Sequence, residues 1–305
     1  MGVVKKEVNV KKQRKKEVKL FGVGMLYLLP AIILLSVFLF YPMFKTLYFS
    51  FFEVQGGGTV ERFVGFENYI SLFKSSEFKE SLKATFLFVL YVVPGEIIVS
   101  LFLAVIASEK MKGMGFFRTI FSSTLGVSVA AGATIFLFIF HPSLGAINNV
   151  LGFLGFGPIE WLTSSKIALI SVAITTIWMH IGINFIILLG GIQNIPEEMY
   201  ESAKIDGAGY FSRLFKITIP MLSPVLFFVS MIAIIGSFQT FGQIDLLTGG
   251  GPDNSTNLIV YSIYKQAFSY GHFGFASAQA IILFFIILLA TIVQFRFGER
   301  KVHYQ

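Results

Sequence analysis

The chain has 305 residues, of which 55% are hydrophobic and 13% are charged, whereas a soluble domain carries about 25% charged residues. These values exclude an ordinary soluble domain and indicate a membrane protein, and the absence of cysteine rules out disulfides and thiolate metal sites. The net charge of +7 does not indicate nucleic-acid binding, because the basic residues lie mostly at one end and beside apolar runs, where membrane topology would place them.

The N-terminal part predicts a basic cytoplasmic tail and a first span. Residues 1–20 hold eight Lys or Arg, and the run from Phe21 to Phe44 then carries no charge over 24 residues. A helix needs about 20 residues to cross a bilayer. The run is too long for a signal peptide and lacks a small-residue cleavage site, so we interpret it as an uncleaved span. Pro30 predicts a kink in this span, and Tyr41-Pro42 predicts its end.

Five further charge-poor windows follow along the chain. Each is longer than the roughly 10 residues of a tilted β-strand and shows no alternation, so each predicts a helix. The windows are 84–108, 119–140, 167–196, 217–244 and 266–295. The predicted fold is therefore an all-α membrane protein with six transmembrane helices and both termini on one side.

The distribution of basic residues predicts which side that is. With the N-terminus in the cytoplasm, the inner segments hold 17 of the 24 Lys and Arg, and the outer segments hold 7. Because basic residues concentrate in cytoplasmic loops, the sequence predicts an N-in, C-in topology and places residues 197–220 in the cytoplasm.

The predicted outer loops contain turn signals and short helices. Residues 55–58 predict a turn and residues 65–73 a short amphipathic helix, with a solvated connector as an equally weighted alternative. Residues 141–166, rich in Gly and Asn with Trp161 near the end, predict an excursion along the membrane interface.

Polar side chains within spans are costly and usually face a cavity or the bundle interior. Glu96, beside Pro94 and Gly95, is the only acid inside a predicted span. It is interpreted either as a pore or relay group or as a carboxyl that is protonated or paired in a broken helix. His180 and Asn184 lie four residues apart and share a helix face, although a lone histidine is more often packed with a satisfied hydrogen bond.

Amide and aromatic side chains near the later spans suit sugar hydroxyls and the apolar faces of sugars. The sequence places none of them on a binding surface. The candidates for the solute path are Asn184, Gln239, Gln243, Asp245, Tyr261 and Gln279.

Catalytic motifs are absent from the sequence. It has no G-x-x-x-x-G-K-[ST] phosphate loop, so the chain cannot hydrolyse ATP by the P-loop route, and the energy for any transport must come from a partner. No metal site is predicted, because no ligand spacing occurs among His141, His180, His272 and His303.

A polar segment, residues 197–224, lies between two long apolar runs and must lie outside the bilayer. Pro196 followed by Glu197 and Glu198 predicts a helix start, since proline there costs no hydrogen bond and carboxylates face the positive end of the helix dipole. Gly207 predicts the end of this helix and also permits the close approach of another chain. A second short helix is predicted to run toward Pro220.

The same segment resembles the EAA loop of binding-protein-dependent ABC importer permeases. The match consists of Glu201-Ser202-Ala203, three residues, Gly207, nine residues, Ile217, one residue and Ile219-Pro220. Ser202 stands where the family has Ala, and Ile219 where it usually has Leu. The resemblance implies a cytoplasmic coupling helix that docks on an ATPase subunit, with the contacts made by Glu201, Ser202, Ala203, Asp206, Gly207, Ala208, Ile217 and Pro220. An ordinary interfacial amphipathic helix is the alternative.

The last outer loop, residues 238–268, narrows the resemblance to one group within this family. It is similar to that of carbohydrate-type permeases, such as maltose-type or glycerol-phosphate-type subunits, at Asp245, Thr248 to Pro252, Thr256 and Tyr264. The resemblance implies a type I ABC importer fold in the cytoplasmic membrane of a bacterium or archaeon, working by alternating access on a sugar, oligosaccharide or polyol-like solute. It further implies a second permease subunit, an ATPase dimer that binds ATP and Mg, a soluble extracytoplasmic binding protein and surrounding lipid.

On this basis the chain divides into a basic tail (1–20), a first helix with its outer loop (21–83), a core permease domain (84–296) with its coupling loop (197–220), and a C-terminal tail (297–305). The chain itself is then no enzyme and binds no cofactor. The main rival is an ion-coupled secondary transporter, disfavoured by the scarcity of acids in the spans and the lack of an evident internal repeat. A structural or assembly protein is the third class.

Overall fold

The computed structural model describes residues 2–109 and 111–298. Met1, Lys110 and residues 299–305, which include Arg300 and Lys301 of the predicted C-terminal tail, lie outside the described residues. Long helices dominate, because a chain in hydrocarbon must satisfy its backbone hydrogen bonds within each segment.

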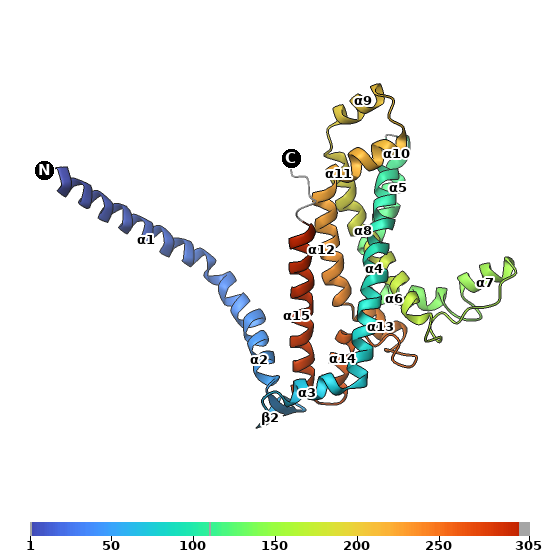
Figure 1. The fold of residues 1–305 in the computed structure, drawn as a ribbon, viewed down its shortest axis with the longest axis horizontal. Coiled ribbons are helices and arrows are strands. Elements are labelled where there is room, and N and C mark those ends of the chain that lie inside the picture. Colours follow the sequence, from blue (N-terminus) through green and yellow to red (C-terminus); the bar gives the residue numbers. More distant parts are fainter. Residues whose placement is uncertain (1, 110, 299–305) are drawn as a thin grey trace.

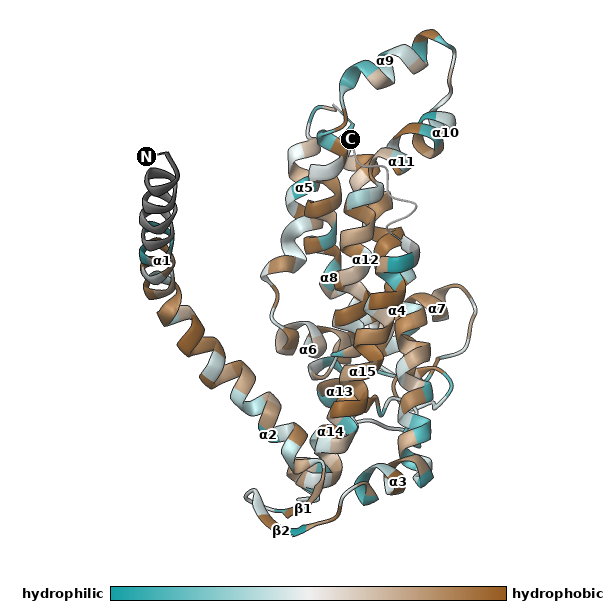
Figure 2. Cartoon of the chain, turned by 60° about the vertical axis from the view of Figure 1, so that its left-hand side comes forward, coloured by the Kyte–Doolittle hydropathy of each residue, from teal (hydrophilic) through white to brown (hydrophobic). Residues whose placement is uncertain are grey.

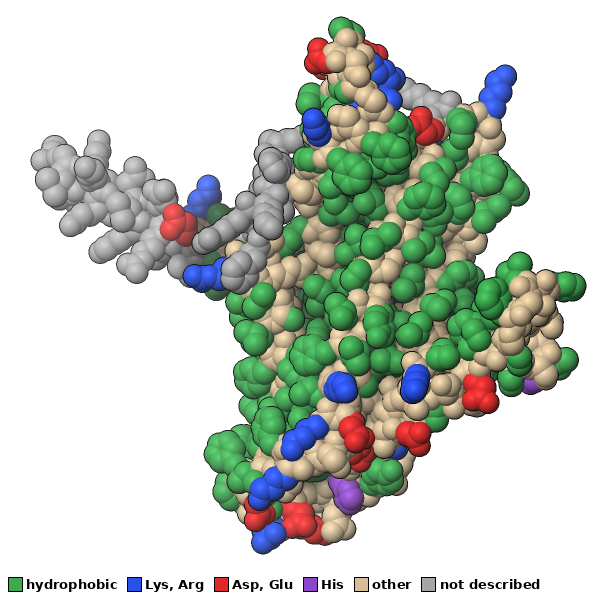
Figure 3. All heavy atoms as spheres, turned by 45° about the vertical axis from the view of Figure 1, so that its right-hand side comes forward, with side chains coloured by type: hydrophobic (Ala, Val, Ile, Leu, Met, Phe, Trp, Pro, Cys, Tyr) green, Lys and Arg blue, Asp and Glu red, His purple; other side chains and the backbone are tan. Residues whose placement is uncertain are grey.

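Four helices in the described part of the chain are long and apolar enough to cross a membrane, and there are up to six spans if each of two bent helix pairs forms one. The four are Lys19–Phe49, Ser76–Ser108, Ala168–Gln193 and Phe273–Arg296, and the pairs are Met114–Gly126 with Val129–Ile139 and Tyr210–Met221 with Ser223–Phe238. Each predicted window overlaps one of these segments, whereas the N-in, C-in topology stays a prediction. Apolar side chains cover the middle of the bundle, and charged side chains gather toward its two ends (Figure 3).

The first helix is longer than predicted. It runs through α1 (Gly2–Leu35), the π-helical turn η1 (Ser36–Phe40) and α2 (Tyr41–Phe49). The predicted end at Tyr41-Pro42 is wrong, and the irregular turn lies directly before Pro42 rather than at Pro30, because the missing N–H of Pro42 removes one regular helical bond. Its last part, α2, contacts α15, whereas α1 leads away from the rest of the bundle (Figure 1), and none of the most apolar window of this helix is buried.

A small β-hairpin follows, which the sequence analysis predicted only as a turn. Strands β1 (Phe52–Gln55) and β2 (Thr59–Phe63) pair antiparallel, and the turn between them holds Gly57 and Gly58 at φ of +84° and +80°, where glycine has no steric cost. The predicted short helix is confirmed as α3 (Glu67–Lys74). Its Asn68 amide donates to the carbonyl oxygens of Ser50 and Phe52 at 3.0 Å each, which fixes the hairpin against α3.

The third and fifth predicted spans are bent rather than continuous. The third is α5 (Met114–Ser122), the 3₁₀ turn η2 (Ser123–Gly126) and α6 (Val129–Ile139), with a bend of 105°. Extended backbone at Ser128 makes this bend, and the Ser128 hydroxyl accepts from the N–H of Ala131 to start α6. The fifth is bent by 69° before α12 (Ser223–Phe238). The prediction of a span reaching Ile244 is also wrong, because α13 (Gly242–Leu247) is a separate helix.

The remaining elements surround the central helix α8 (Ala168–Gln193), which contacts α4, α5, α6, α12 and α13. The other helices are α4 (Ser76–Ser108), α7 (Ala146–Phe153), α9 (Glu197–Ile205), α10 (Tyr210–Arg213), η3 (Leu214–Thr218), α11 (Ile219–Met221), α14 (Ile259–Tyr264), η4 (Lys265–Ser269) and α15 (Phe273–Gly298). The predicted start of the sixth span at Gln266 is wrong, because Gly271 at φ +75° separates η4 from α15. Figure 2 shows apolar residues along α4, α8, α12 and α15, with hydrophilic residues at α9 and at the hairpin.

Candidate functional site: a surface helix pair and a buried polar cluster

The polar segment between α8 and α12 forms the two helices predicted from the sequence. α9 begins after Pro196 with two acidic residues in its first turn, and α10, η3 and α11 form a second continuous helix from Tyr210 to Met221. The pair lies at the end of the bundle opposite the β-hairpin (Figure 1).

Gly207 ends α9 through its backbone conformation. Its φ of +77° is left-handed, the N–H of Gly207 donates to the carbonyl of Lys204 at 3.1 Å, and the N–H of Ala208 donates to the carbonyl of Ala203 at 2.8 Å. These two bonds form a Schellman cap, which satisfies carbonyls that the helix end leaves free. The glycine predicted from the sequence is therefore required by the turn itself.

The surface of α9 is open. No residue of the helix is buried, Glu201, Ser202 and Asp206 are exposed, and Ile205 exposes 86% of its surface. A Cβ placed on Gly207 would meet no atom within 4 Å. Ile205 is thus an exposed apolar side chain within the predicted contact segment. It was not predicted as a contact residue, and its signal was an apolar residue directly before the Asp206-Gly207 cap.

The second helix fixes the pair to the bundle. The hydroxyls of Tyr200 in α9 and Thr218 in η3 lie 3.0 Å apart in a hydrogen bond, and Thr218 is buried. Ile217 and Pro220 are partly buried beside the bend that leads into α12. The predicted coupling residues therefore separate into an exposed set and a partly buried set. The exposed residues are Glu201, Ser202, Asp206 and Gly207, and the partly buried ones are Ala203, Ala208, Ile217 and Pro220.

A cavity of about 890 Å³ lies between this helix pair and the ends of α4, α5 and α8. In its wall, Arg118 donates from Nε and Nη2 to the carbonyl oxygen of Ala107 at 2.9 and 2.7 Å. A guanidinium at this position satisfies a carbonyl of the last turn of α4 and complements the negative end of its dipole. The α9 end of the bundle is therefore held by side-chain capping as well as by packing.

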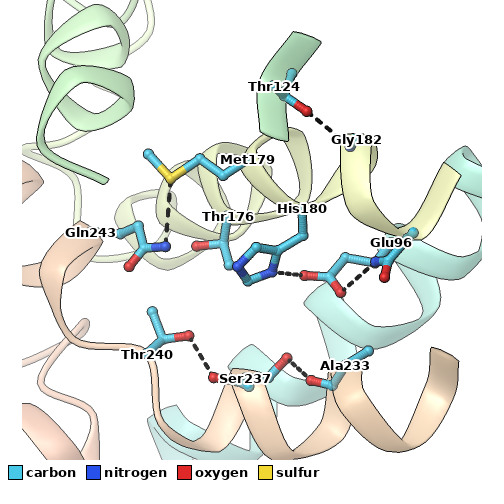
Figure 4. Close-up of polar contacts among 12 residues, drawn as sticks. Glu96, Thr124, Thr176, Met179, His180, Gly182, Ala233, Ser237, Thr240 and Gln243 are labelled. Atoms are coloured by element: carbon cyan, nitrogen blue, oxygen red, sulfur yellow. Dashed lines mark hydrogen bonds and ion pairs between the residues drawn. The ribbon is translucent and has the colours of Figure 1, made fainter. Parts of the chain in front are cut away.

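A second group of polar residues lies in the middle of the bundle, between α4, α8, α12 and α13 (Figure 4). We call it the polar cluster, and it comprises Glu96, Thr176, His180, Asn184, Ser237, Thr240 and Gln243. Glu96 Oε1 lies 2.5 Å from Nδ1 of His180, and Asn184 Nδ2 donates to the other oxygen, Oε2, at 3.2 Å. Glu96 is buried, with 1% of its side chain exposed, whereas 36% of the His180 side chain is exposed.

The local sequence explains why Glu96 meets α8. α4 runs unbroken through Pro94 and Gly95, so the broken helix of the second interpretation is wrong, whereas the carboxyl is paired with His180, as that interpretation allowed. A Cβ on Gly95 would overlap the end methyl of Ile177. The missing side chain therefore lets α4 and α8 approach closely, which brings Glu96 to His180 and Asn184.

The other solute-path candidates divide into two groups. Gln243 is a buried member of the polar cluster, with Nε2 3.5 Å from Sδ of Met179, and Gln239 is exposed at the end of α12. Gln279 is instead buried against α14, where its amide donates to Ser262 Oγ at 3.1 Å. The hydroxyls of Thr176, Ser237 and Thr240 were not predicted, since hydroxyl side chains within apolar helices commonly bond to their own backbone.

Asp245 and Tyr261 lie apart from the polar cluster, beside the glycine-rich loop. Asp245 is exposed, and Tyr261 is 8% exposed. Burial raises the pKa of the Tyr261 phenol above its usual value of 10, and the Asp245 carboxylate raises it further. The loop itself is closed by Thr256, which donates to the carbonyl of Gly251 at 2.7 Å and lies 2.7 Å from the Thr248 hydroxyl.

Residues 73–303 match the family described as "Binding-protein-dependent transport system inner membrane component". The sn-glycerol-3-phosphate transport system permease protein UgpA of Yersinia pestis bv. Antiqua (strain Antiqua) is 34% identical over 283 residues, which cover 92% of this chain and 95% of that protein. The UgpA of Escherichia coli O157:H7 is 33% identical over 279 residues, covering 90% and 94%.

Solved structures share the fold. A chain of a bacterial alginate ABC transporter in complex with an alginate pentasaccharide-bound periplasmic protein has a TM-score of 0.79 at 24% identity, and the match covers 93% of this chain and 96% of that chain. A second structure, of a bacterial ABC transporter involved in the import of the acidic polysaccharide alginate, has a TM-score of 0.78 at 24% identity.

Proposed function

We propose that this chain, which belongs to the family of inner membrane components of binding-protein-dependent transport systems, forms part of the translocation path of an ATP-driven importer for a sugar or related polar solute. The observation that carries the proposal is the open helix α9 with its Gly207 cap, at the end of the bundle opposite the hairpin. The comparisons give no support to an ion-coupled transporter.

We assign the coupling function to α9. The exposed Glu201 and Ile205 form the contact surface for an ATPase subunit, and Thr218 transmits movement of α9 to the bent fifth span through its bond with Tyr200. ATP and Mg bind to the ATPase dimer, so hydrolysis takes place outside this chain.

Purification of the complete complex tests this assignment. Glu201→Lys reverses a charge on the contact surface, and Gly207→Asp adds bulk and charge to it. Both variants should reduce co-purification of the ATPase or solute-stimulated ATP hydrolysis while this subunit still reaches the membrane. Glu61→Lys, on the exposed strand β2 at the opposite end, serves as the control for co-purification of the ATPase. If both α9 variants retain wild-type uptake and ATPase co-purification, the coupling function is wrong.

The first helix supports a second membrane subunit as a partner. The most apolar window of Lys19–Phe49 has no buried residue, and side chains such as Phe38 expose 74% of their surface. Because α1 and η1 stand apart from the bundle (Figure 1), this part of the helix is available to pack against another permease subunit.

The hairpin end of the molecule is proposed to face the soluble binding protein. The closed loop from Thr248 to Pro252 lies toward this end, and we assign it to the response to that protein. The solute class rests on the relatives: one transports sn-glycerol-3-phosphate by name, and the alginate transporter was solved with a pentasaccharide-bound periplasmic protein. The chain is thus proposed to move a hydroxyl-rich solute by alternating access.

The sidedness follows from the 17-to-7 split of basic residues. Reporter fusions after Lys112 and Gly207 should give a cytoplasmic signal, and fusions after Phe140 and Gly250 an external one. A cytoplasmic signal from the Gly250 fusion would contradict the proposed N-in, C-in topology, because α9 would then lie outside the cell and could not reach a cytoplasmic ATPase.

A further inference from the structure

We infer that His180, held by Glu96, is the specificity-determining contact of this chain and that the solute carries an anionic group, a carboxylate or a phosphate. This inference rests on the proposed function and narrows its solute class. It starts from the polar cluster, which lies near the middle of the two long helices α4 and α8 (Figure 4).

His180 is the accessible member of the polar cluster. Thr176 and Ser237 are fully buried, and the exposed fractions of the other members are 1% for Glu96, 3% for Asn184, 5% for Gln243 and 6% for Thr240. The His180 side chain is 36% exposed. A solute that passes this surface therefore meets the imidazole before any other polar group of the cluster.

The bonds of Glu96 determine what the imidazole presents. A carboxylate at 1% exposure is costly unless a proton or a cation neutralises it. Asn184 supplies a hydrogen bond but no charge, and Glu96 is the only Asp, Glu, Lys or Arg in residues 84–108, 168–193 and 223–238. His180 is therefore the group that shares the neutralising proton.

Both placements of that proton leave a hydrogen on Nε2. If Nδ1 of His180 holds it, the ring is an imidazolium with N–H groups on both nitrogens. If Glu96 holds it, the carboxylic acid donates to Nδ1, and the neutral ring carries its hydrogen on Nε2. Among the described residues nothing forms a hydrogen bond with Nε2. The accessible nitrogen is thus a donor in both states of the neutralised pair.

A donor that belongs to a buried Glu–His pair favours an anionic acceptor. When Nδ1 holds the proton, the positive end of the pair faces outward with the carboxylate behind it, and charge-assisted hydrogen bonds are roughly twice as strong as neutral ones. The two other helices that contribute residues to the cluster bring no second acid to the imidazole. α12 carries no charged residue, and the carboxylate of Asp245 in α13 is exposed.

The test uses the complete complex with its binding protein in proteoliposomes. The probes are sn-glycerol-3-phosphate and acidic alginate oligosaccharides, compared with the neutral maltotriose. We expect an acidic probe to stimulate ATP hydrolysis and enter the vesicles. If only maltotriose does so, the inference is overturned and the proposed function stands. If no probe stimulates hydrolysis and the ATPase does not assemble with this chain, both fail.

Two variants then test the residue. For the effective acidic probe, His180→Gln should raise the half-saturating concentration on the order of 10-fold with little change in maximal rate, because it removes a charge-assisted donor. Glu96→Gln should act in the same direction. The half-saturating concentration of the double variant should be no higher than that of His180→Gln alone, since both substitutions act through the same Nε2–H.

The control is Lys112→Gln, which removes an exposed cationic donor between α4 and α5, away from the polar cluster and from the hairpin end, and should leave the half-saturating concentration unchanged. A lower maximal rate or poorer assembly with an unchanged half-saturating concentration would show that the Glu96–His180 pair only holds α4 to α8. Equal effects of His180→Gln and Lys112→Gln would likewise overturn the inference.

Discussion

The close packing of α4 on α8 at Gly95 gives a prediction whose sign depends on one neighbouring side chain. Gly95→Ala has two opposing effects. Alanine in a helix interior is favoured over glycine by about 1 kcal/mol. The new Cβ would overlap the end methyl of Ile177 and lie 3.2 Å from its Cγ1, and overpacking of this kind costs about 1–3 kcal/mol. The net change should be a loss of about 0–2 kcal/mol.

The same substitution should have the opposite effect when Ile177 is shortened. Ile177→Ala removes both contacting atoms, so that only the gain in helix propensity remains, and Gly95→Ala should then stabilise the chain by about 1 kcal/mol. The coupling energy between the two positions equals the overpacking cost, about 1–3 kcal/mol.

Denaturant unfolding of the purified chain in mixed micelles measures the four free energies of this cycle. Gly190→Ala is the matched control, because a Cβ at this helical glycine of α8 would meet no atom within 4 Å, and it should stabilise the chain in either background. If Gly95→Ala changes the free energy of unfolding equally in the wild-type chain and in the Ile177→Ala variant, α4 and α8 do not pack as described.

Three further predictions concern other parts of the molecule. Gly207→Ala and Gly113→Ala should introduce similar backbone strain, since φ is +77° and +86° and neither Cβ would meet an atom within 4 Å. Only Gly207→Ala should weaken co-purification of the ATPase, and equal losses from both variants would refute docking at the Gly207 cap. Because the chain has no cysteine, a thiol-reactive photo-cross-linker attached at Phe38→Cys should form a covalent bond to the second membrane subunit. A product with lipid alone would contradict this contact. Burial and Asp245 raise the folded-state pKa of Tyr261, so stability should fall as pH rises above about 10, and Tyr261→Phe should remove that part of the fall in alkaline unfolding.

The sequence predicted the helical membrane fold because hydropathy and backbone satisfaction leave few alternatives. It also predicted both helices of the coupling segment and the Gly207 cap, since capping signals are local and need no knowledge of the tertiary structure. The errors lie where apolar content continues across a break. Residues 119–140 contain no charge, yet Gly126 and Ser128 flank a bend of 105°. A hydropathy window averages over such a break, and the hydroxyl cap at Ser128 was the available signal.

The pairing of Glu96 could be anticipated only as a choice between alternatives, and the structure shows why. The i, i+4 spacing of His180 and Asn184 fixes that they share a face of α8, but no local rule says which helix that face meets. The deciding feature is Gly95, one residue before the acid, whose missing side chain admits Ile177. A glycine adjacent to the lone acid of a span therefore indicates that another helix packs closely at that point. The hydrogen-bond partner of the acid should be sought on the helix whose side chain occupies the space left by the glycine.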